Sequence, residues 1–216
     1  MTNWLHEQRL NAAIAVVRQC CAGTVLDLGC GDGDFLTRLA VEPQIQRIVG
    51  VDLCEASLGR LRQRLARLDR LHAQVDLIQG SLTEGAHALI GFDCAVLIET
   101  IEHIEPGRLS TLERAVFAEM QPATVVITTP NAEFNPLLGV PPRRYRHPDH
   151  RFEWDRERFR RWTHGVAARN GYSAACSDIA GSHPSLGGAS QMAVFQTTPV
   201  SGQEPPKGLS TMASSA

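Results

Sequence analysis

Short apolar runs alternate with amphipathic segments through residues 1–130, and no other feature restricts the fold of this chain as strongly. The runs have the length of strands, and the segments between them carry apolar residues at helical spacing. Such alternation is typical of a parallel sheet whose strands are joined by crossover helices. We therefore expect a doubly wound α/β fold with a mostly parallel sheet and helices on both faces. The predicted strands are 24–28, 47–52, 75–79, 92–98 and 124–128, and the predicted helices are 4–19, a segment through Phe35, Leu36 and Leu39, 55–68 and 108–119.

The rhythm changes after Pro130, where several prolines and a dense group of arginines fall within residues 131–154. A stretch of this kind predicts a long functional loop rather than a crossover. A helix over 155–169 follows, and the runs 172–179 and 191–197 are expected to close the sheet as a hairpin-like pair. The sheet should then contain about seven strands.

The composition is that of one soluble domain, which we assign to residues 1–198, followed by a Ser-, Gly-, Pro- and Ala-rich tail over 199–216 that we expect to be disordered. A net charge of −2 excludes a global basic field, so any binding of nucleic acid must be local. No apolar stretch has the length of a membrane span, and the polar N-terminus does not fit a signal peptide. The six cysteines lack the CxxC spacing of metal or redox sites. A cytoplasmic protein without a membrane partner is the expectation.

A glycine-rich turn follows the first predicted strand, where residues 25–33 read VLDLGCGDG. Its glycines allow the backbone to turn tightly and to approach a ligand closely. Asp52 ends the second predicted strand, where a carboxylate can accept hydrogen bonds from both hydroxyls of a ribose. Asp27 lies at the start of the turn and can face an ammonium group. The alternative is a turn whose glycines only permit close packing of a helix on a strand.

Residues 99–103 read ETIEH and follow the apolar end of the fourth predicted strand. On a helical turn, positions i, i+3 and i+4 share one face, so we expect Glu99, Glu102 and His103 to converge there. Two carboxylates and an imidazole supply most of a metal site, at the sheet edge where α/β folds bind ligands. The alternative is an ordinary helix start, where carboxylates favour the positive end of the helix dipole.

The glycine turn and the acidic end of the second strand resemble the S-adenosylmethionine site of class I methyltransferases, which have a Rossmann-like fold. The resemblance implies that S-adenosylmethionine is the methyl donor. It implies a donor site formed by Asp27, Gly29, Gly31, Asp52, Leu53, Ser81 and Leu82. The first three would line the methionine end, the next two would hold the ribose and adenine, and the last two would flank the adenine ring.

Three further segments narrow the resemblance: TTPNAEFN at 128–135, RHPDHRFEW at 146–154 and ASQMAVF at 189–195. Together with ETIEH they are similar to the RNA 3′-terminal ribose 2′-O-methyltransferases, a family that modifies small RNAs in eukaryotes and takes part in RNA repair in bacteria. The similarity covers roughly residues 5–197. It implies methyl transfer to the 2′-hydroxyl of an RNA with a free 3′-terminal ribose. It also implies that a partner protein of a small-RNA or RNA-repair pathway has to be considered.

The same resemblance implies a metal site of two glutamates and two histidines, carried here by Glu99, Glu102, His103 and His150. His147 competes for the fourth place, and we prefer His150 because it precedes the Arg-Phe-Glu-Trp run that fixes the match. Such a ligand set suits Mn²⁺ or Mg²⁺. Only the terminal nucleotide of an RNA has both ribose hydroxyls free, so an ion that chelates them would select the 3′ end and lower the pKa of the 2′-hydroxyl. His103 or His150 would be the catalytic base.

Arginines and aromatic residues surround the predicted metal histidine in the sequence. Arg143, Arg144 and Arg146 are placed to bind phosphates of the last nucleotides, and the alternative for them is a solvated charged surface. Phe152 and Trp154 can stack on the terminal base, although packing against the core is the simpler expectation.

Two other functions stay open at the level of sequence. A small-molecule O-methyltransferase would use the same ligands to chelate a catechol-like diol and would be indifferent to RNA. A non-catalytic, methyltransferase-like subunit would bind RNA without activity. The complete metal set and the complete glycine turn argue against the second alternative, because a non-catalytic relative needs neither.

Overall fold

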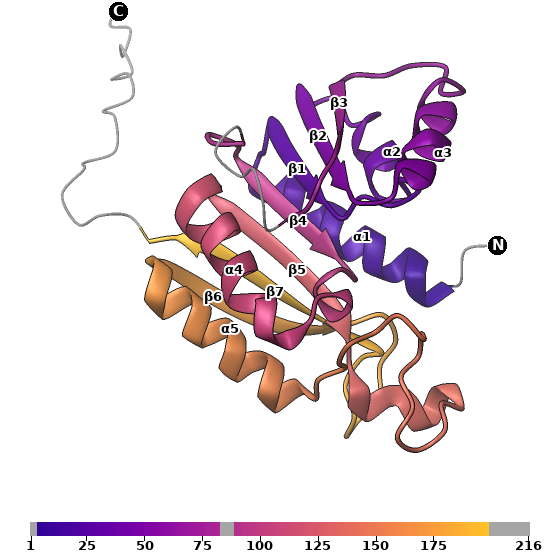
Figure 1. The fold of residues 1–216 in the computed structure, drawn as a ribbon, viewed down its shortest axis with the longest axis vertical. Coiled ribbons are helices and arrows are strands. Elements are labelled where there is room, and N and C mark those ends of the chain that lie inside the picture. Colours follow the sequence, from indigo (N-terminus) through magenta and orange to yellow (C-terminus); the bar gives the residue numbers. More distant parts are fainter. Residues whose placement is uncertain (1–3, 83–88, 199–216) are drawn as a thin grey trace, which may run out of the picture.

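A twisted seven-stranded sheet forms the centre of the molecule in the computed structural model, which describes residues 4–82 and 89–198 (Figure 1). The strand order is β3-β2-β1-β4-β5-β7-β6, and β7 is antiparallel to both of its neighbours, whereas the other pairs are parallel. This confirms the predicted doubly wound, mostly parallel fold with a late antiparallel pair. The strands are β1 (Thr24–Leu28), β2 (Arg47–Asp52), β3 (Gln74–Gln79), β4 (Cys94–Ile98), β5 (Thr124–Pro130), β6 (Tyr172–Ile179) and β7 (Ser190–Thr197).

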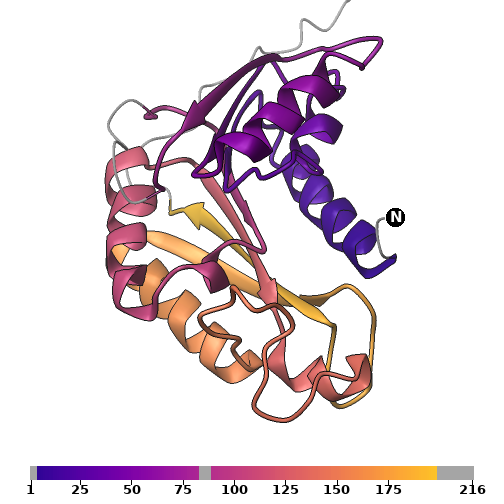
Figure 2. The same cartoon turned by 45° about the vertical axis from the view of Figure 1, so that its right-hand side comes forward.

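Helices cover both faces of the sheet (Figure 2). One face carries α1 (Trp4–Gln19), α2 (Leu36–Leu39) and α3 (Glu55–Leu65). The other face carries α4 (Leu109–Glu113) and α5 (Arg156–Asn170). The predicted helix 108–119 is present as α4 and a directly following π-helix, Arg114–Met120.

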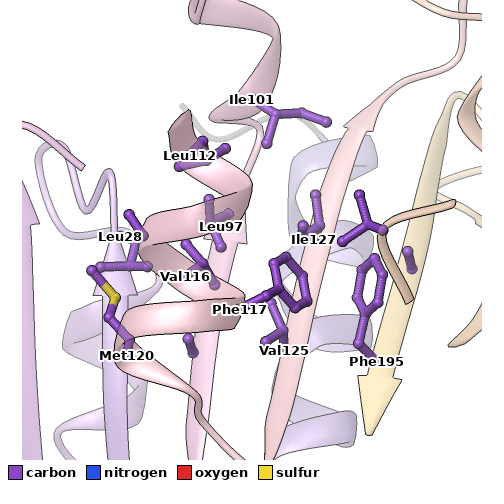
Figure 3. Packing of buried hydrophobic residues seen from close by; sticks show 14 of the residues in the cluster. Leu28, Leu97, Ile101, Leu112, Val116, Phe117, Met120, Val125, Ile127 and Phe195 are labelled. Carbon is purple, nitrogen blue, oxygen red and sulfur yellow. The ribbon is translucent and has the colours of Figure 1, made fainter. Parts of the chain in front are cut away.

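The sheet has an apolar core on each face. Both cores exist because successive side chains of a strand point to opposite faces of the sheet. In β4, Val96 packs with the α1, α2 and α3 side, whereas its neighbour Leu97 packs with the α4 and α5 side. Figure 3 shows the second of these clusters, in which Phe117 lies edge-on to Phe195 with ring centroids 4.8 Å apart. Because both faces are covered, the central strands are apolar over nearly their whole length.

The segment between β5 and α5 is irregular, as the sequence predicts. It contains a 3₁₀-helix, Ala132–Leu138, and returns to the sheet at an isolated bridge between Asn131 and Trp154. Asp155 caps the start of α5, because its side chain accepts a hydrogen bond from the Arg158 amide at 2.7 Å.

The strand order reverses between β1 and β4, so the chain leaves these neighbouring strands toward opposite faces of the sheet. This is the place where open α/β sheets form a crevice at the carboxyl ends of their strands. The glycine turn follows β1 and the ETIEH segment follows β4, so both predicted motifs meet at this crevice. The predicted tail over 199–216 lies outside the described residues. Among the helices of 4–82 and 89–198, none is long and apolar enough to cross a membrane.

Candidate functional site

A cavity of about 510 Å³ opens at the carboxyl ends of β1, β2 and β4. Its wall contains all but one of the residues predicted to bind the methyl donor, namely Gly29, Gly31, Asp52, Leu53, Ser81 and Leu82. Glu99 and His103 from the predicted metal set line the same cavity. The expected donor residues and two expected metal ligands therefore face one common space.

Two glycines of the turn after β1 have different tasks. Gly29 has a φ of +85°, and a Cβ atom there would lie 2.5 Å from Cγ2 of Thr100, so close packing requires glycine. At Gly31 nothing lies within 4 Å of an added Cβ atom, so its backbone borders open space. Asp52 ties this turn to the end of β2, because its Oδ2 accepts the Gly31 amide at 2.8 Å. The turn is thereby held next to the cavity.

Asp27, the remaining predicted donor residue, is a buried carboxyl group in β1. It borders a smaller neighbouring cavity of about 180 Å³, which Gly29 and Gly31 also line. Burial, together with the nearby negative charge of Asp52, raises the pKa of Asp27 to about 7. Its Oδ2 has no hydrogen-bond partner. A buried carboxylate without a partner is costly, and a cationic ligand would relieve that cost.

Glu99 and Glu102 follow β4 but do not lie on one helical turn, so the predicted i, i+3, i+4 geometry is wrong. Glu99 has a left-handed φ of +50°, and a 3₁₀ turn begins only at Ile101. The side chain of Thr128 in β5 holds this conformation: its Oγ1 accepts the Glu99 amide at 3.0 Å and donates to Glu99 Oε1 at 3.1 Å. A left-handed backbone at a non-glycine residue is uncommon, and such positions cluster at functional sites.

Glu102 is completely buried. Thr129 Oγ1 donates to its Oε2 at 3.0 Å, whereas its Oε1 has no hydrogen-bond partner. Burial, and next the negative charge of Glu99, raise the pKa of Glu102 well above its usual value. A carboxylate in this position is stabilised by a positive charge brought to its unpaired oxygen.

Arg9 of α1 supplies a positive charge that local sequence patterns do not reveal. Its Nε lies 3.2 Å from Glu99 Oε1, and the same nitrogen donates to Ser190 Oγ at 3.2 Å. Arg9 lies on a helix far from ETIEH in the sequence, and only the packing of α1 beside β4 and β5 brings it to the site. The guanidinium partly neutralises the carboxylate pair.

Three imidazoles form a group at the site. One nitrogen atom from each of His103, His147 and His150 lies within 4.8 Å of the others. The ring centroid of His103 is 4.8 Å from that of His150 and 6.0 Å from that of His147. Burial, followed by the proximity of His150 and His147, lowers the pKa of His103, so its ring is neutral near neutral pH. We name this group the histidine cluster.

The two histidines of the long loop differ in their hydrogen bonds. Nδ1 of His150 lies 2.6 Å from Oε1 of Glu153. Burial opposes the charge of Glu153, but the bonds from His150, Asn135 and the Arg146 amide outweigh it and lower the pKa of Glu153. This carboxylate is therefore an acceptor, so His150 donates through Nδ1 and keeps the lone pair of Nε2 free for a metal.

His147 has the opposite arrangement, because its Nδ1 accepts the backbone amide of Asp149 at 3.2 Å. A neutral ring whose Nδ1 accepts must carry its proton on Nε2. Nε2 of His147 is then a hydrogen-bond donor rather than a free ligand atom. This difference favours His150 over His147 as the metal ligand. Glu153, which orients His150, was missed as a functional residue, although it stands in the DHRFEW segment.

Arg146 does not have the surface position expected of an RNA contact. Its Nε donates to Asn135 Oδ1, its Nη1 donates to the Ala189 carbonyl at 2.7 Å, and its Nη2 donates to the Asn131 carbonyl. The prediction that Arg146 binds RNA is therefore wrong, because its guanidinium is occupied by hydrogen bonds within the loop and to the segment before β7. Arg143 and Arg144 are exposed and line a second cavity of about 430 Å³.

Phe152 and Trp154 are buried and stack on each other with ring centroids 4.3 Å apart. Packing against the core, the simpler of the two expectations, is confirmed for both rings. Neither ring is free to receive a base.

The residues present fit a divalent cation, as judged from their donors. The imidazole nitrogens of the histidine cluster and the unpaired, buried Oε1 of Glu102 are two kinds of donor that suit Mn²⁺ or Mg²⁺. Within the described residues, Glu99 and Glu102 do not belong to the 4.8 Å group of the histidines. Donors to one ion stand only about 2.1 Å from it, so ligation by all four residues requires side-chain movement, and Glu99 would leave Arg9.

Known proteins of similar sequence are methyltransferases. Residues 25–122 match the family model described as "Methyltransferase domain". A small RNA 2′-O-methyltransferase from Gallus gallus is 37% identical over 203 residues, which cover 88% of this chain and 53% of that protein. The chain thus spans about half the length of the vertebrate relatives it matches.

Solved structures show the same relationship. The crystal structure of the methyltransferase domain of bacterial CtHen1-CN is 35% identical, with a TM-score of 0.79, and the match covers 89% of this chain and 99% of that one. The structure of the small RNA methyltransferase HEN1 is 32% identical, with a TM-score of 0.82, over 89% of this chain and 26% of that one.

Proposed function

Because this chain belongs to the small RNA 2′-O-methyltransferase family, we propose that it transfers a methyl group from S-adenosylmethionine to the 2′-hydroxyl of the 3′-terminal ribose of RNA, with the help of Mn²⁺ or Mg²⁺. The observation that carries the proposal is the position of His103. It lines the donor cavity and also belongs to the histidine cluster, so a methyl donor and a metal-bound ribose would meet there.

The donor would lie along the carboxyl ends of β1, β2 and β3. Asp52 would accept hydrogen bonds from the ribose hydroxyls, and Leu53, Ser81 and Leu82 would flank the adenine. Asp27 would meet the ammonium group of the methionine end, where a positive charge compensates its buried carboxylate. Gly29 and Gly31 would allow the donor to lie against the backbone.

Glu99, Glu102, His103 and His150 would hold the metal, with Glu153 orienting His150 and Thr129 orienting Glu102. When bound, a divalent ion supplies a Lewis acid that chelates vicinal hydroxyls and makes the 2′-hydroxyl more acidic. The remaining chemistry is mainly positioning, because methyl transfer needs the 2′-oxygen in line with the carbon–sulfur bond.

A histidine would receive the proton. The 2′-oxygen forms a bond to the methyl carbon, the carbon–sulfur bond breaks, and its electron pair stays on sulfur to give S-adenosylhomocysteine. Of the two histidines that the sequence offers as the base, His150 has no nitrogen left for a proton, because its Nδ1 donates to Glu153 and its Nε2 is assigned to the metal. His103 would therefore accept the proton of the 2′-hydroxyl and pass it to water. The lowered pKa of His103 keeps its ring neutral and able to accept a proton near neutral pH.

The test of this function uses labelled S-adenosylmethionine, Mn²⁺ and a short RNA. We expect incorporation with a free 3′ diol and none with a 3′-phosphate, a 2′-deoxy end or a chelator. Equal labelling of the 3′-phosphate RNA would contradict the diol mechanism. Methylation of a catechol in place of RNA would identify the small-molecule alternative, and RNA binding without any transfer would identify a non-catalytic subunit.

The ligand assignment is tested separately with His150→Ala and His147→Ala. We expect His150→Ala to abolish turnover and Mn²⁺ binding while the affinity for S-adenosylhomocysteine survives. If His147→Ala removes Mn²⁺ binding and His150→Ala does not, the assignment of the fourth ligand is wrong. The need for a small-RNA or RNA-repair partner stays a prediction. It is tested by comparing the methyltransferase activity of the isolated chain with the activity of a cell extract to which the chain has been added.

A further inference from the structure

The second cavity shares His147 with the histidine cluster. Its volume is about 430 Å³, and it is lined by Pro141, Arg143, Arg144, Tyr145, His147 and Pro148. His147 lines this cavity and also belongs to the histidine cluster, just as His103 joins that cluster to the donor cavity. Two neighbouring histidines therefore link the donor cavity to the second cavity.

Tyr145 is an exposed aromatic side chain in the wall of the second cavity. It is 49% exposed, whereas Phe134, Phe152 and Trp154 from the same long loop are 8%, 5% and 4% exposed. An aromatic ring held at a cavity wall offers a face for a nucleobase, and stacking on it does not depend on the base identity. Tyr145 is therefore better placed to stack on a base than Phe152 or Trp154, for which the sequence suggested that role.

Arg143 and Arg144 carry charges without partners. Within the described residues, neither side chain has a hydrogen bond or an ion pair, whereas Arg146 braces the loop and Arg151 lies 3.2 Å from Glu105. Arg143 also has a left-handed φ of +62°, so the backbone turns sharply where the two guanidinium groups leave the loop. Two uncompensated cations beside an exposed aromatic ring suit a nucleotide, because its phosphate carries negative charge and its base offers a face for stacking.

His147 adds a directed donor to this cavity. Because its Nδ1 accepts the Asp149 amide, the neutral ring presents Nε2–H. A phosphate oxygen accepts such a hydrogen bond, whereas a metal ion would require the bare nitrogen.

We propose that the second cavity binds the penultimate nucleotide of the RNA: its base stacks on Tyr145, and the phosphate that joins it to the terminal nucleotide accepts from His147 Nε2–H and pairs with Arg143 and Arg144. This proposal rests on the proposed function, since it places the terminal ribose at the histidine cluster. It makes recognition of the RNA end independent of sequence.

The first test uses RNA with 2-aminopurine at the penultimate position, and its fluorescence is followed upon binding in the presence of S-adenosylhomocysteine. We expect quenching by wild type and by Tyr145→Phe, and little quenching by Tyr145→Ala, together with about tenfold weaker binding. Leu137→Ala is the matched control, because Leu137 is an exposed apolar residue of the same loop. An abasic penultimate position should bind wild type and Tyr145→Ala equally.

The outcomes separate this proposal from the proposed function. If wild type methylates a 3′-terminal ribose but Tyr145→Ala binds and quenches normally, or if quenching occurs only with 2-aminopurine at the last position, the assignment of the cavity is overturned. If wild type transfers no methyl group to RNA, the proposed function fails first. For His147→Ala we expect weaker RNA binding with unchanged Mn²⁺ affinity, and an equal loss of Mn²⁺ affinity to that of His150→Ala would contradict its role as a donor.

Discussion

At this site, residues of the same type have different hydrogen-bonding roles because their immediate neighbours differ. His150 donates to Glu153 and His147 accepts from the Asp149 amide, so one ring offers a lone pair and the other a proton. The same rule sets the acids apart: Asp27 is buried without a partner on its Oδ2, whereas Asp52 accepts the backbone amides of Gly31 and Cys54. The roles proposed here follow from these neighbours rather than from residue identity.

The orientation of His150 gives the first prediction. In Glu153→Gln the acceptor of the Nδ1 proton loses its charge, so the ring is less firmly oriented. We expect Mn²⁺ affinity to fall about 10- to 100-fold, as for other residues that orient a metal-ligating histidine. Electron paramagnetic resonance of free Mn²⁺ measures this. Glu157→Gln on the exposed surface of α5 is the matched control, and equal affinities in both variants would refute the role of Glu153.

The raised pKa of Asp27 predicts a pH dependence. Its pKa of about 7 in the folded chain lies above an unfolded value near 3.9, so the folded state binds the proton more tightly. This contribution to stability is complete below about pH 4 and is lost as the pH rises through about 7. In the absence of donor, wild type should therefore lose stability over this range relative to Asp27→Asn.

Thermal unfolding of the two proteins across this pH range measures the difference. S-adenosylmethionine, which brings an ammonium group, should bind wild type more tightly as the pH rises through about 7, and calorimetry should lose this trend in Asp27→Asn. Parallel stability curves for the two proteins would show that Asp27 keeps an ordinary pKa.

The contact of Gly29 with Thr100 predicts a strong substitution effect. Gly29→Ala places a Cβ atom 2.5 Å from Cγ2 of Thr100 at a φ of +85°, so the turn must shift. We expect a loss of about 1–3 kcal/mol in the free energy of unfolding and weaker donor binding. Urea unfolding measures the first. Gly59→Ala in α3, where nothing lies within 4 Å of the added atom, should instead be neutral or stabilising. Equal destabilisation of both variants would exclude the proposed clash.

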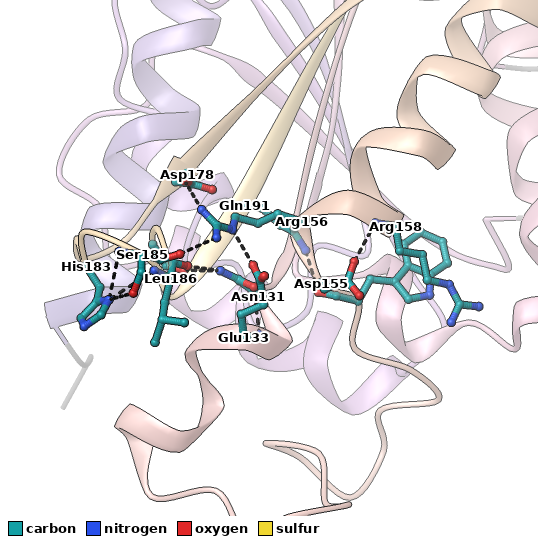
Figure 4. Close-up of polar contacts among 12 residues, drawn as sticks. Asn131, Glu133, Asp155, Arg156, Arg158, Asp178, His183, Ser185, Leu186 and Gln191 are labelled. Atoms are coloured by element: carbon teal, nitrogen blue, oxygen red, sulfur yellow. Dashed lines mark hydrogen bonds and ion pairs between the residues drawn. The ribbon is translucent and has the colours of Figure 1, made fainter.

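At the scale of elements, the long loop between β5 and α5 works because it is anchored at its base. Asn131 follows β5, and its buried amide donates to the carbonyls of Leu186 at 2.8 Å and Gly188 at 2.9 Å (Figure 4). Its Oδ1 accepts the Glu133 amide at 3.0 Å, which caps the 3₁₀-helix of the loop. The segment that carries the histidines is therefore fixed to the segment that precedes β7.

Removal of this anchor is a direct test. Asn131→Ala leaves two carbonyls and one amide without partners, so we expect a loss of about 1–3 kcal/mol in the free energy of unfolding. Urea unfolding gives the value. Asn11→Ala on the exposed side of α1 is the control and should change little. An unaltered unfolding midpoint in Asn131→Ala would mean that the loop is held elsewhere.

At the scale of the whole molecule, the charge distribution matters more than the net charge. The chain as a whole carries −2, so attraction to RNA has to come from a local excess of cations beside the site. Most described arginines near the site pair with acids or carbonyls of the protein, as Arg9 and Arg156 do. Arg143 and Arg144 do not, and they stand at the second cavity.

This distribution predicts a measurable salt dependence. Arg143→Gln and Arg144→Gln should each weaken RNA binding and reduce the slope of log affinity against log salt by about 0.7, the value for one contact to a single-stranded phosphate. Fluorescence anisotropy over a salt series measures the slope. Arg161→Gln is the control, because Arg161 pairs with Glu157 on the exposed surface of α5. Equal slopes in all four proteins would exclude contacts from Arg143 and Arg144 to phosphate.

The sequence by itself determined the sheet, its late antiparallel pair and most of the donor residues, because apolar period and glycine turns are local properties that tertiary packing preserved. It also determined which residue types meet at the sheet edge, through the resemblance of ETIEH and DHRFEW to one family. Only the tertiary structure decided that Glu99 leaves β4 in a left-handed conformation, that Arg146 braces the loop, and that Arg9 approaches Glu99. These features depend on contacts between segments that are distant in the sequence. A single such contact decides whether a charged side chain is free to bind a ligand or is held by the protein itself.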